Sequence, residues 1–175
     1  MNNELKKITQ AFAELSERGL KGVRYTRALS QYRFYFATVH VLKNGRPLMV
    51  IAYIPDHAPV FGKVYLTNCT IECFLPGHWE RVAFLYFELK QDKAHIVDLY
   101  VQPFCRRQGL GSLMLSLLED IASSFAMKQI SGWLSSVDVR IRDVQIAFYR
   151  ANGYSVKCHD DQCTEGFVTK DIPTA

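Results

Sequence analysis

The sequence has no hydrophobic run long enough to cross a bilayer. Its longest apolar stretch is Leu48–Ile54, whereas a membrane helix needs about 20 residues. The first 19 residues also lack the continuous apolar centre of a secretory signal, because Glu4, Lys6 and Lys7 interrupt it. We therefore expect a soluble, cytoplasmic protein with no membrane partner.

The cysteine pattern lacks any CxxC pair. The number of cysteines is odd, and Cys158 and Cys163, separated by four residues, have no second pair with which to complete a zinc site. We predict no metal site, and reduced thiols that serve mostly as packing residues in a reducing compartment. The prediction covers all five cysteines: Cys69, Cys73, Cys105, Cys158 and Cys163.

Acidic residues are absent between Glu17 and Asp56. The net charge of +4 is too mild to imply nucleic acid as a partner. The preferred interpretation is a solvated basic edge, and the alternative is a docking surface for phosphate or an acidic partner. Seven basic residues lie in this interval: Arg18, Lys21, Arg24, Arg27, Arg33, Lys43 and Arg46.

The first half of the chain predicts one helix and then antiparallel strands. Apolar residues at helical spacing indicate a helix over 5–15. Tyr, Phe, Val, Ile and Thr then dominate up to Val101, which is typical of strands. Asn44-Gly45 predicts a hairpin with a type I′ turn. The expected strands are Arg33–Leu42, Leu48–Tyr53, Lys63–Phe74, Arg81–Leu89 and His95–Val101.

The second half predicts helices alternating with strands. An amphipathic helix over 113–125 precedes a strand at Gln129–Leu134, and a second helix at Asp143–Ala151 precedes a hairpin of Tyr154–Cys158 with Gly166–Lys170. At 175 residues the chain fits one domain. The fold class expected is α/β, with a single mixed, mostly antiparallel sheet and flanking helices.

The segment from His95 to Ser112 carries the chemistry, because it leads from a strand through a short loop to the start of a helix. Gly109 and Gly111 lack Cβ atoms and allow close approach to the main chain. The free amides and the dipole at a helix N-terminus favour a phosphate or pyrophosphate there. Arg106 and Arg107 add positive charge.

Two common phosphate-binding patterns are excluded. No Gly-xxxx-Gly-Lys-Ser/Thr loop is present, and the glycine pair at 109 and 111 has no third glycine. The spacing Arg106-xx-Gly109-x-Gly111, after the run 99–103 (Leu-Tyr-Val-Gln-Pro) and before Ala147-Phe148-Tyr149-xxx-Gly153-Tyr154, instead resembles the GNAT superfamily of N-acetyltransferases. The resemblance covers roughly residues 95–156.

The resemblance implies a central pair of parallel strands splayed by a bulge, with acetyl-CoA as the donor in the gap. The amides of Leu99 and Val101 would bind the acyl carbonyl and pantetheine, and those from Arg107 to Ser112 the pyrophosphate. Many family members carry an asparagine where this chain has Arg142 or Asp143, so either Arg142 would contact phosphate instead or this contact would be missing. The implied coenzyme site comprises Leu99, Tyr100, Val101, Arg106, Arg107, Gln108, Gly109, Leu110, Gly111, Ser112 and Arg142.

The resemblance also suggests how the acetyl group would move. Tyr149 is the candidate acid for the departing thiolate, with a core aromatic as the alternative reading. His95 is the candidate base, because imidazole has an unperturbed pKa of about 6.5. Further candidates for the base are Asp98, Glu88 and Glu72. The implied reaction is direct attack by an amine within a ternary complex.

The expected organisation is a single acyltransferase domain over 1–175. Residues 1–93 would form the acceptor side, 94–156 the acetyl-CoA-binding core and 157–175 the C-terminal hairpin. The acceptor would be a small-molecule or peptide amine. The sequence is compatible with a homodimer. The alternative function is a non-catalytic module that binds acyl-CoA without turnover.

Overall fold

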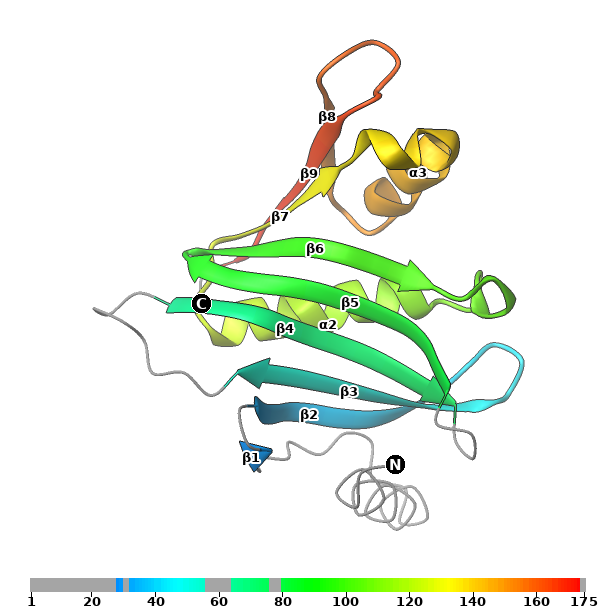
Figure 1. Ribbon diagram of the computed structural model, residues 1–175, viewed down its shortest axis with the longest axis vertical. Helices are drawn as coiled ribbons and strands as arrows, with labels where there is room; N and C mark the ends of the chain where they lie inside the picture. Colours follow the sequence, from blue (N-terminus) through cyan, green and yellow to red (C-terminus); the bar gives the residue numbers. More distant parts are fainter. Residues whose placement is uncertain (1–27, 30–31, 56–63, 76–79, 174–175) are drawn as a thin grey trace.

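The computed structural model describes residues 28–29, 32–55, 64–75 and 80–173 (Figure 1). The predicted helix over 5–15 lies outside these residues, and so do four of the seven basic residues between Glu17 and Asp56, namely Arg18, Lys21, Arg24 and Arg27. The elements are β1 (Ala28–Leu29), β2 (Tyr32–Val41), β3 (Pro47–Pro55), β4 (Val64–Leu75), β5 (Glu80–Gln91), β6 (Lys93–Val101), η1 (Pro103–Cys105), α2 (Leu110–Ser124), β7 (Gln129–Leu134), η2 (Ser136–Ile141), α3 (Arg142–Ala151), β8 (Ser155–Cys158) and β9 (Gly166–Asp171).

All the described strands form one sheet in the order β1-β2-β3-β4-β5-β6-β7-β9-β8. Only β6 and β7 pair in parallel, and α2 connects them. Every other neighbouring pair is antiparallel. This arrangement confirms the predicted fold class.

The hairpin between β2 and β3 is confirmed, but its predicted turn type is wrong. The amide of Gly45 donates to the carbonyl of Leu42 at 2.9 Å, and Gly45 has φ +82°. Asn44 does not have positive φ, which a type I′ turn requires. The loop is instead a type I turn followed by a left-handed glycine, because three residues rather than two separate the closing pair of Leu42 and Arg46.

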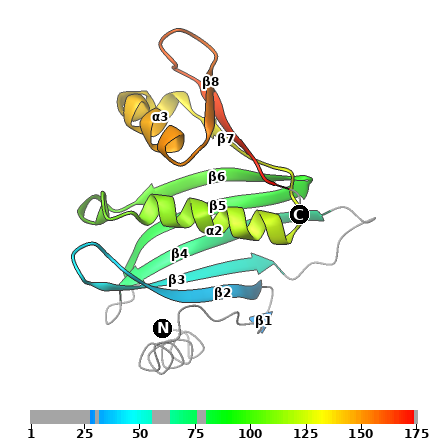
Figure 2. The same cartoon turned by 180° about the vertical axis from the view of Figure 1, so that it is seen from behind.

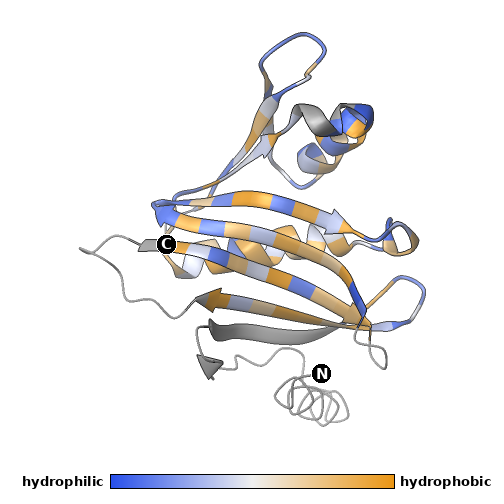
Figure 3. Ribbon diagram, in the orientation of Figure 1, coloured by the Kyte–Doolittle hydropathy of each residue, from blue (hydrophilic) through white to orange (hydrophobic). Residues whose placement is uncertain are grey.

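Helix α2 covers one face of the sheet, behind the central strands in Figure 1 and in front of them in Figure 2. Its apolar stripe is fully buried against β5, β6 and β7. In Figure 3, orange and blue segments alternate along the central strands, as expected for strands with one face in the core. Within the described part of the chain, no helix is long and apolar enough to cross a membrane. The stripe comprises Met114, Leu115, Leu118, Ile121 and Ala122.

A bulge in β6 separates the two parallel strands. Tyr86 of β5 pairs with Asp98, but the next residue, Phe87, pairs with Ile96, so Val97 is an extra residue in β6. The last pair between β6 and β7 is Ile96 with Gly132. Beyond this point β6 stays with β5 while β7 stays with β9, and Figure 1 shows the two strands diverging. The predicted splay is therefore present.

The prediction that all five cysteines are reduced thiols is wrong for two of them. Cys158 and Cys163 form a disulfide, with their Cα atoms 4.8 Å apart. The hairpin of β8 and β9 accounts for this, because Cys158 ends β8 and the connecting loop returns Cys163 to it. Cys69, Cys73 and Cys105 are free and buried, as predicted for packing residues.

The buried thiols predict how stability depends on pH. Burial, with a smaller contribution from nearby carboxylates, raises the pKa of Cys69 and of Cys73 from an ordinary value of 9.0 to about 12. The folded state therefore holds these protons more tightly than the unfolded state does. We expect the free energy of unfolding to fall as pH rises from 9 towards 12, by up to about 1.4 kcal/mol per pH unit for each thiol.

Urea denaturation between pH 7 and 10.5 measures this dependence. The Cys69→Ala/Cys73→Ala double variant is the control. It should be less stable overall, but its free energy of unfolding should fall less steeply above pH 9. Equal slopes for both proteins above pH 9 would contradict the assignment.

Candidate active site

The gap between β6 and β7 exposes unpaired main-chain groups of β6. The amide of Gln102 donates to the Val82 carbonyl on β5 at 2.8 Å. Because successive residues of a strand direct their main-chain groups to opposite sides, the amides of Val101 and Leu99 point away from β5 and into the gap. The amide of Tyr100 points the other way, towards β5, where Tyr100 is paired with Phe84.

The loop after β6 places the N-terminus of α2 at the open end of the gap. Arg107 and Gly109 both have positive φ, at 62° and 88°. Gly109 is the N-cap of α2, and its carbonyl accepts the first helical hydrogen bond, from Leu113, at 2.9 Å. The amides of Leu110, Gly111 and Ser112 therefore have no acceptor within the helix. No acidic residue in the first turn competes for them.

Polar side chains of the loop complement an anion at this helix end. The Arg106 Nε donates to the Val101 carbonyl at 3.1 Å, which holds this exposed guanidinium beside the gap. Arg107 is also exposed. The Gln108 Oε1 is buried without a hydrogen-bond partner.

Gly111 allows α3 to pack directly onto the start of α2. A Cβ atom at Gly111 would lie 2.9 Å from two ring atoms of Phe148 and 3.9 Å from Leu99. The Phe148 ring of α3 therefore packs on the start of α2, next to Leu99 of β6. The sequence predicts only that Gly111 lets a ligand approach the main chain. It does not predict the contact with Phe148, because no sequence spacing links the two residues.

Tyr149 is buried on α3 among other rings. Its ring lies edge-on to Tyr154, with centroids 5.6 Å apart, and to Phe148 at 5.2 Å. Burial, together with the smaller effect of the Asp98 and Asp138 charges, raises the pKa of Tyr149 to about 12. The phenol therefore stays protonated at neutral pH, and the Asp98 carboxylate on β6 acts on it electrostatically.

His95 lies where β6 and β7 are still paired. Its Nδ1 is 3.2 Å from the hydroxyl of Ser131, its register partner on β7. Glu88 is its partner on β5, but the Glu88 carboxylate is ion-paired to Lys90 at 2.5 Å. Among the described contacts, no hydrogen bond joins His95 to Tyr149. The two predicted catalytic residues lie on different elements, His95 on β6 and Tyr149 on α3. The separation of β6 from β7 begins after Ile96, directly next to His95.

Aromatic and charged side chains line the sheet face opposite α2. The guanidinium of Arg81 pairs with Glu72 at 2.7 Å and donates to the Tyr86 hydroxyl at 2.6 Å. It also lies 4.6 Å from the centroid of the Phe84 ring. The Phe84 ring also stacks on Tyr100, with centroids 5.6 Å apart. Tyr100 thus presents its side chain to this face.

The structure contradicts the sequence-based role of Arg142 as a phosphate contact. Arg142 is only 3% exposed. Its guanidinium donates to the carbonyls of Ser135 and Thr164, at 2.6 and 2.9 Å, and to the side chain of Gln145 at 2.9 Å. The Arg142 side chain is buried beside α3 because main-chain carbonyls after β7 and in the β8–β9 loop accept its hydrogen bonds there. Arg142 is therefore left out of the coenzyme site.

Within the described residues, no group of three or more His, Cys, Asp or Glu side chains could hold a metal ion. The arrangement that remains is a gap lined by free amides, with a helix N-terminus and arginines at its open end and a protonated phenol beside it. Such a site suits a long ligand that carries a diphosphate and a polar, amide-containing arm.

Several solved structures are similar in fold. A protein of Klebsiella pneumoniae assigned to the acyl-CoA N-acyltransferases has 21% identity and a TM-score of 0.51, covering 60% of this chain and 72% of its own. A GNAT family acetyltransferase of Staphylococcus aureus has 14% identity and a TM-score of 0.50, covering 60% and 68%. At these identities the likeness concerns the fold alone. No curated protein matches the sequence.

The family itself is established by a match to most of the chain. The model of the acetyltransferase (GNAT) family matches residues 9–154, a span that contains the bulged strand, the glycine loop, α2 and α3. Membership implies acyl transfer from an acyl-coenzyme A to an acceptor. The chain thus belongs to the acetyltransferase (GNAT) family.

Proposed function

We propose that this protein is an N-acetyltransferase that moves the acetyl group of acetyl-CoA directly to an amine within a ternary complex. The observation that carries the proposal is the parting of β6 and β7 after Ile96 and Gly132, which leaves main-chain donors open beside the N-terminus of α2. Acetyl-CoA has the matching chemistry: a diphosphate for the helix and an amide-containing arm for the strand edge.

The donor would lie along β6. Its diphosphate would accept from the amides between Arg107 and Ser112, where Arg106 and Arg107 supply positive charge. Its pantetheine arm would pair with the main chain at Val101, in the manner of an added strand. The amide of Leu99 would then donate to the thioester oxygen. As that oxygen becomes an oxyanion during attack, such a donor is worth about 3 kcal/mol.

The proton transfers fall to residues on either side of the gap. His95, directly or through water, would take the proton of the attacking amine, and the nearby carboxylate of Asp98 would attract the ammonium form. Tyr149 would donate its proton to the coenzyme sulfur as the carbon–sulfur bond breaks. The carboxylates of Glu72 and Glu88 are less suited as the base, because each is already paired with a cation.

The acceptor would approach from the sheet face opposite α2, and residues 1–93 would form the acceptor side. A small-molecule or peptide amine fits this proposal, and cytoplasmic location and a single domain over 1–175 remain predictions from the sequence. A panel of tyramine, spermidine and a lysine-containing peptide, assayed for loss of the thioester absorbance, tests transfer. Binding of acetyl-CoA without transfer to any amine would favour the non-catalytic module.

We expect acetyl-CoA to bind through the loop at Gly109, and a pair of matched glycine variants tests this. Gly109 and Gly45 both have positive φ, at 88° and 82°, and a Cβ at either would meet nothing within 4 Å. Alanine at either position should cost about 1–2 kcal/mol of stability, because side chains disfavour this conformation. Only Gly109→Ala should also weaken acetyl-CoA binding, by at least tenfold.

Calorimetric titration with acetyl-CoA measures the binding, and urea denaturation confirms that both variants are folded. Equal affinities of the two variants, or no heat of binding with the wild-type protein, would overturn the proposed coenzyme site.

We expect Tyr149→Phe to lower kcat by about 100-fold and to leave the KM for acetyl-CoA within about threefold, because a general acid acts on the transition state. Tyr154→Phe removes a hydroxyl from the same group of rings and should change kcat by less than twofold. Since the pKa of Tyr149 is raised to about 12, its deprotonation should not lower the wild-type kcat below pH 10. An unchanged kcat for Tyr149→Phe would remove Tyr149 from this role.

A further inference from the structure

Arg142 is the one buried charged side chain in the part of the chain that the structure describes. Burying a cation is costly unless its donors are satisfied. The Nε of Arg142 has no hydrogen-bond partner, so the charge depends on the acceptors that its two terminal nitrogens reach. Its position is therefore sensitive to the loss of any one of them.

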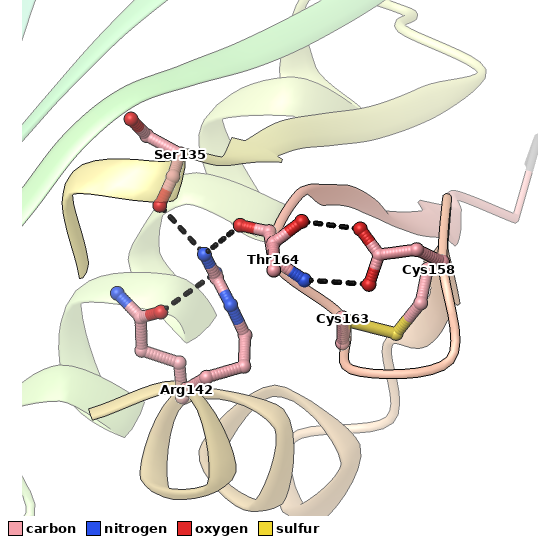
Figure 4. The surroundings of a disulfide bond; sticks show 7 residues. Ser135, Arg142, Cys158, Cys163 and Thr164 are labelled. Atoms are coloured by element: carbon pink, nitrogen blue, oxygen red, sulfur yellow. Dashed lines mark hydrogen bonds between the residues drawn. A yellow bond between two sulfur atoms is a disulfide. The ribbon is translucent and has the colours of Figure 1, made fainter. Parts of the chain in front are cut away.

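The acceptors of Arg142 come from three separate segments, as Figure 4 shows. Ser135 follows β7, Gln145 lies one turn further along α3, and Thr164 belongs to the loop between β8 and β9. Gln145 continues the network to Asp138, at 3.3 Å. The guanidinium thereby fixes the start of α3 against the end of β7 and against the β8–β9 loop.

The disulfide holds the Thr164 acceptor in place. Thr164 directly follows Cys163, which is bonded to Cys158 at the end of β8. Asp160 braces the same loop, because its carboxylate accepts from both the amide and the hydroxyl of Thr164. A main-chain hydrogen bond also crosses the β8–β9 loop, because the amide of His159 donates to the Glu165 carbonyl at 3.0 Å. Breaking the disulfide would leave hydrogen bonds, among them that of the Cys163 amide to the Asp160 carbonyl at 3.0 Å, to position the Thr164 carbonyl.

Movement of Arg142 would reach the proposed acid. Arg142 and Tyr149 are seven residues apart on α3, so they lie on the same face of the helix, two turns from each other. Both are buried. Phe148, which directly precedes Tyr149 in the chain, contacts the start of α2 at Gly111. A shift of the first turn of α3 would therefore displace the phenol relative to the gap.

We propose that Arg142 is a positioning residue for Tyr149, and that the Cys158–Cys163 pair controls it as a thiol–disulfide switch. The proposal rests on the proposed function, in which Tyr149 is the acid. A dithiol reductant attacks the disulfide, the sulfur–sulfur bond breaks, and two electrons and two protons pass to the cysteines as the reductant forms its own disulfide. Cys158 is the partly exposed member of the pair and the accessible point of attack. The oxidised protein is the more active form.

The first experiment compares the oxidised and the dithiothreitol-reduced wild-type protein. Alkylation of the denatured protein should count three free thiols before reduction and five after it. On reduction, we expect hydrogen exchange to accelerate at least fivefold in the amides of α3, with no change in β3–β5. We expect kcat to fall at least fivefold with the best amine of the panel, while the Kd for acetyl-CoA stays within twofold.

Variants separate the switch from a general loss of structure. Cys158→Ser/Cys163→Ser should match the reduced wild-type protein and should not respond to dithiothreitol, although its three free cysteines remain. Arg142→Met should give the same accelerated exchange in α3 and abolish the response of kcat to reduction. Arg142→Lys, which keeps the charge but fewer donors, should lie in between. Arg150→Met, at an exposed arginine of the same helix, is the matched control.

The outcomes distinguish the two proposals. Unchanged exchange in α3 after confirmed reduction would overturn the switch, whether or not an active amine is found, and so would an undiminished redox response of Arg142→Met. Accelerated hydrogen exchange in α3 on reduction, in a protein that transfers acetyl to no amine, would support the control of α3 by the disulfide. It would count against the proposed function. If Arg142→Met does not fold, the reduced wild-type protein and the cysteine variant still decide the question.

Discussion

The unpaired edge of β6 is the constraint around which the rest of the structure is arranged. Neighbouring strands of a sheet normally satisfy one another's main-chain groups, yet the bulge at Val97 ends the pairing of β6 with β7 and leaves main-chain groups of β6 open. The fold maintains the opening because each strand keeps its other neighbour, β5 for β6 and β9 for β7. In the proposed function, a ligand with amide and diphosphate groups would supply the missing hydrogen-bond partners.

The two sides of the gap are stabilised in different ways. On the β6 side, α2 buries a continuous apolar stripe against the central strands, so this side is a rigid platform. On the β7 side, α3 has fewer apolar contacts with the sheet and is fixed by a buried cation, main-chain carbonyls and a loop closed by a disulfide. Polar contacts of this kind depend on geometry more than apolar packing does. The acid that we propose, Tyr149, is carried by this second side.

The sequence predicted most of the fold because its signals are local. The strands from Arg33–Leu42 to Gly166–Lys170 and the helices at 113–125 and Asp143–Ala151 follow from residue types and spacing, and their expected boundaries differ from the observed ones by a few residues. The turn at Asn44-Gly45 shows where local signals end. The dipeptide predicts a hairpin correctly, but the register of β2 with β3 sets the number of loop residues and hence the turn type.

The sequence by itself determined the family, the glycine loop and the order of the elements, since each depends on residues that are neighbours along the chain. The tertiary structure alone decided the partners of Arg142, the pairing of Cys158 with Cys163 and the packing of Phe148 on Gly111. These contacts join segments that come together only when the sheet forms. A residue's type limits what it can bind, but the approach of a distant segment decides which of those partners it meets.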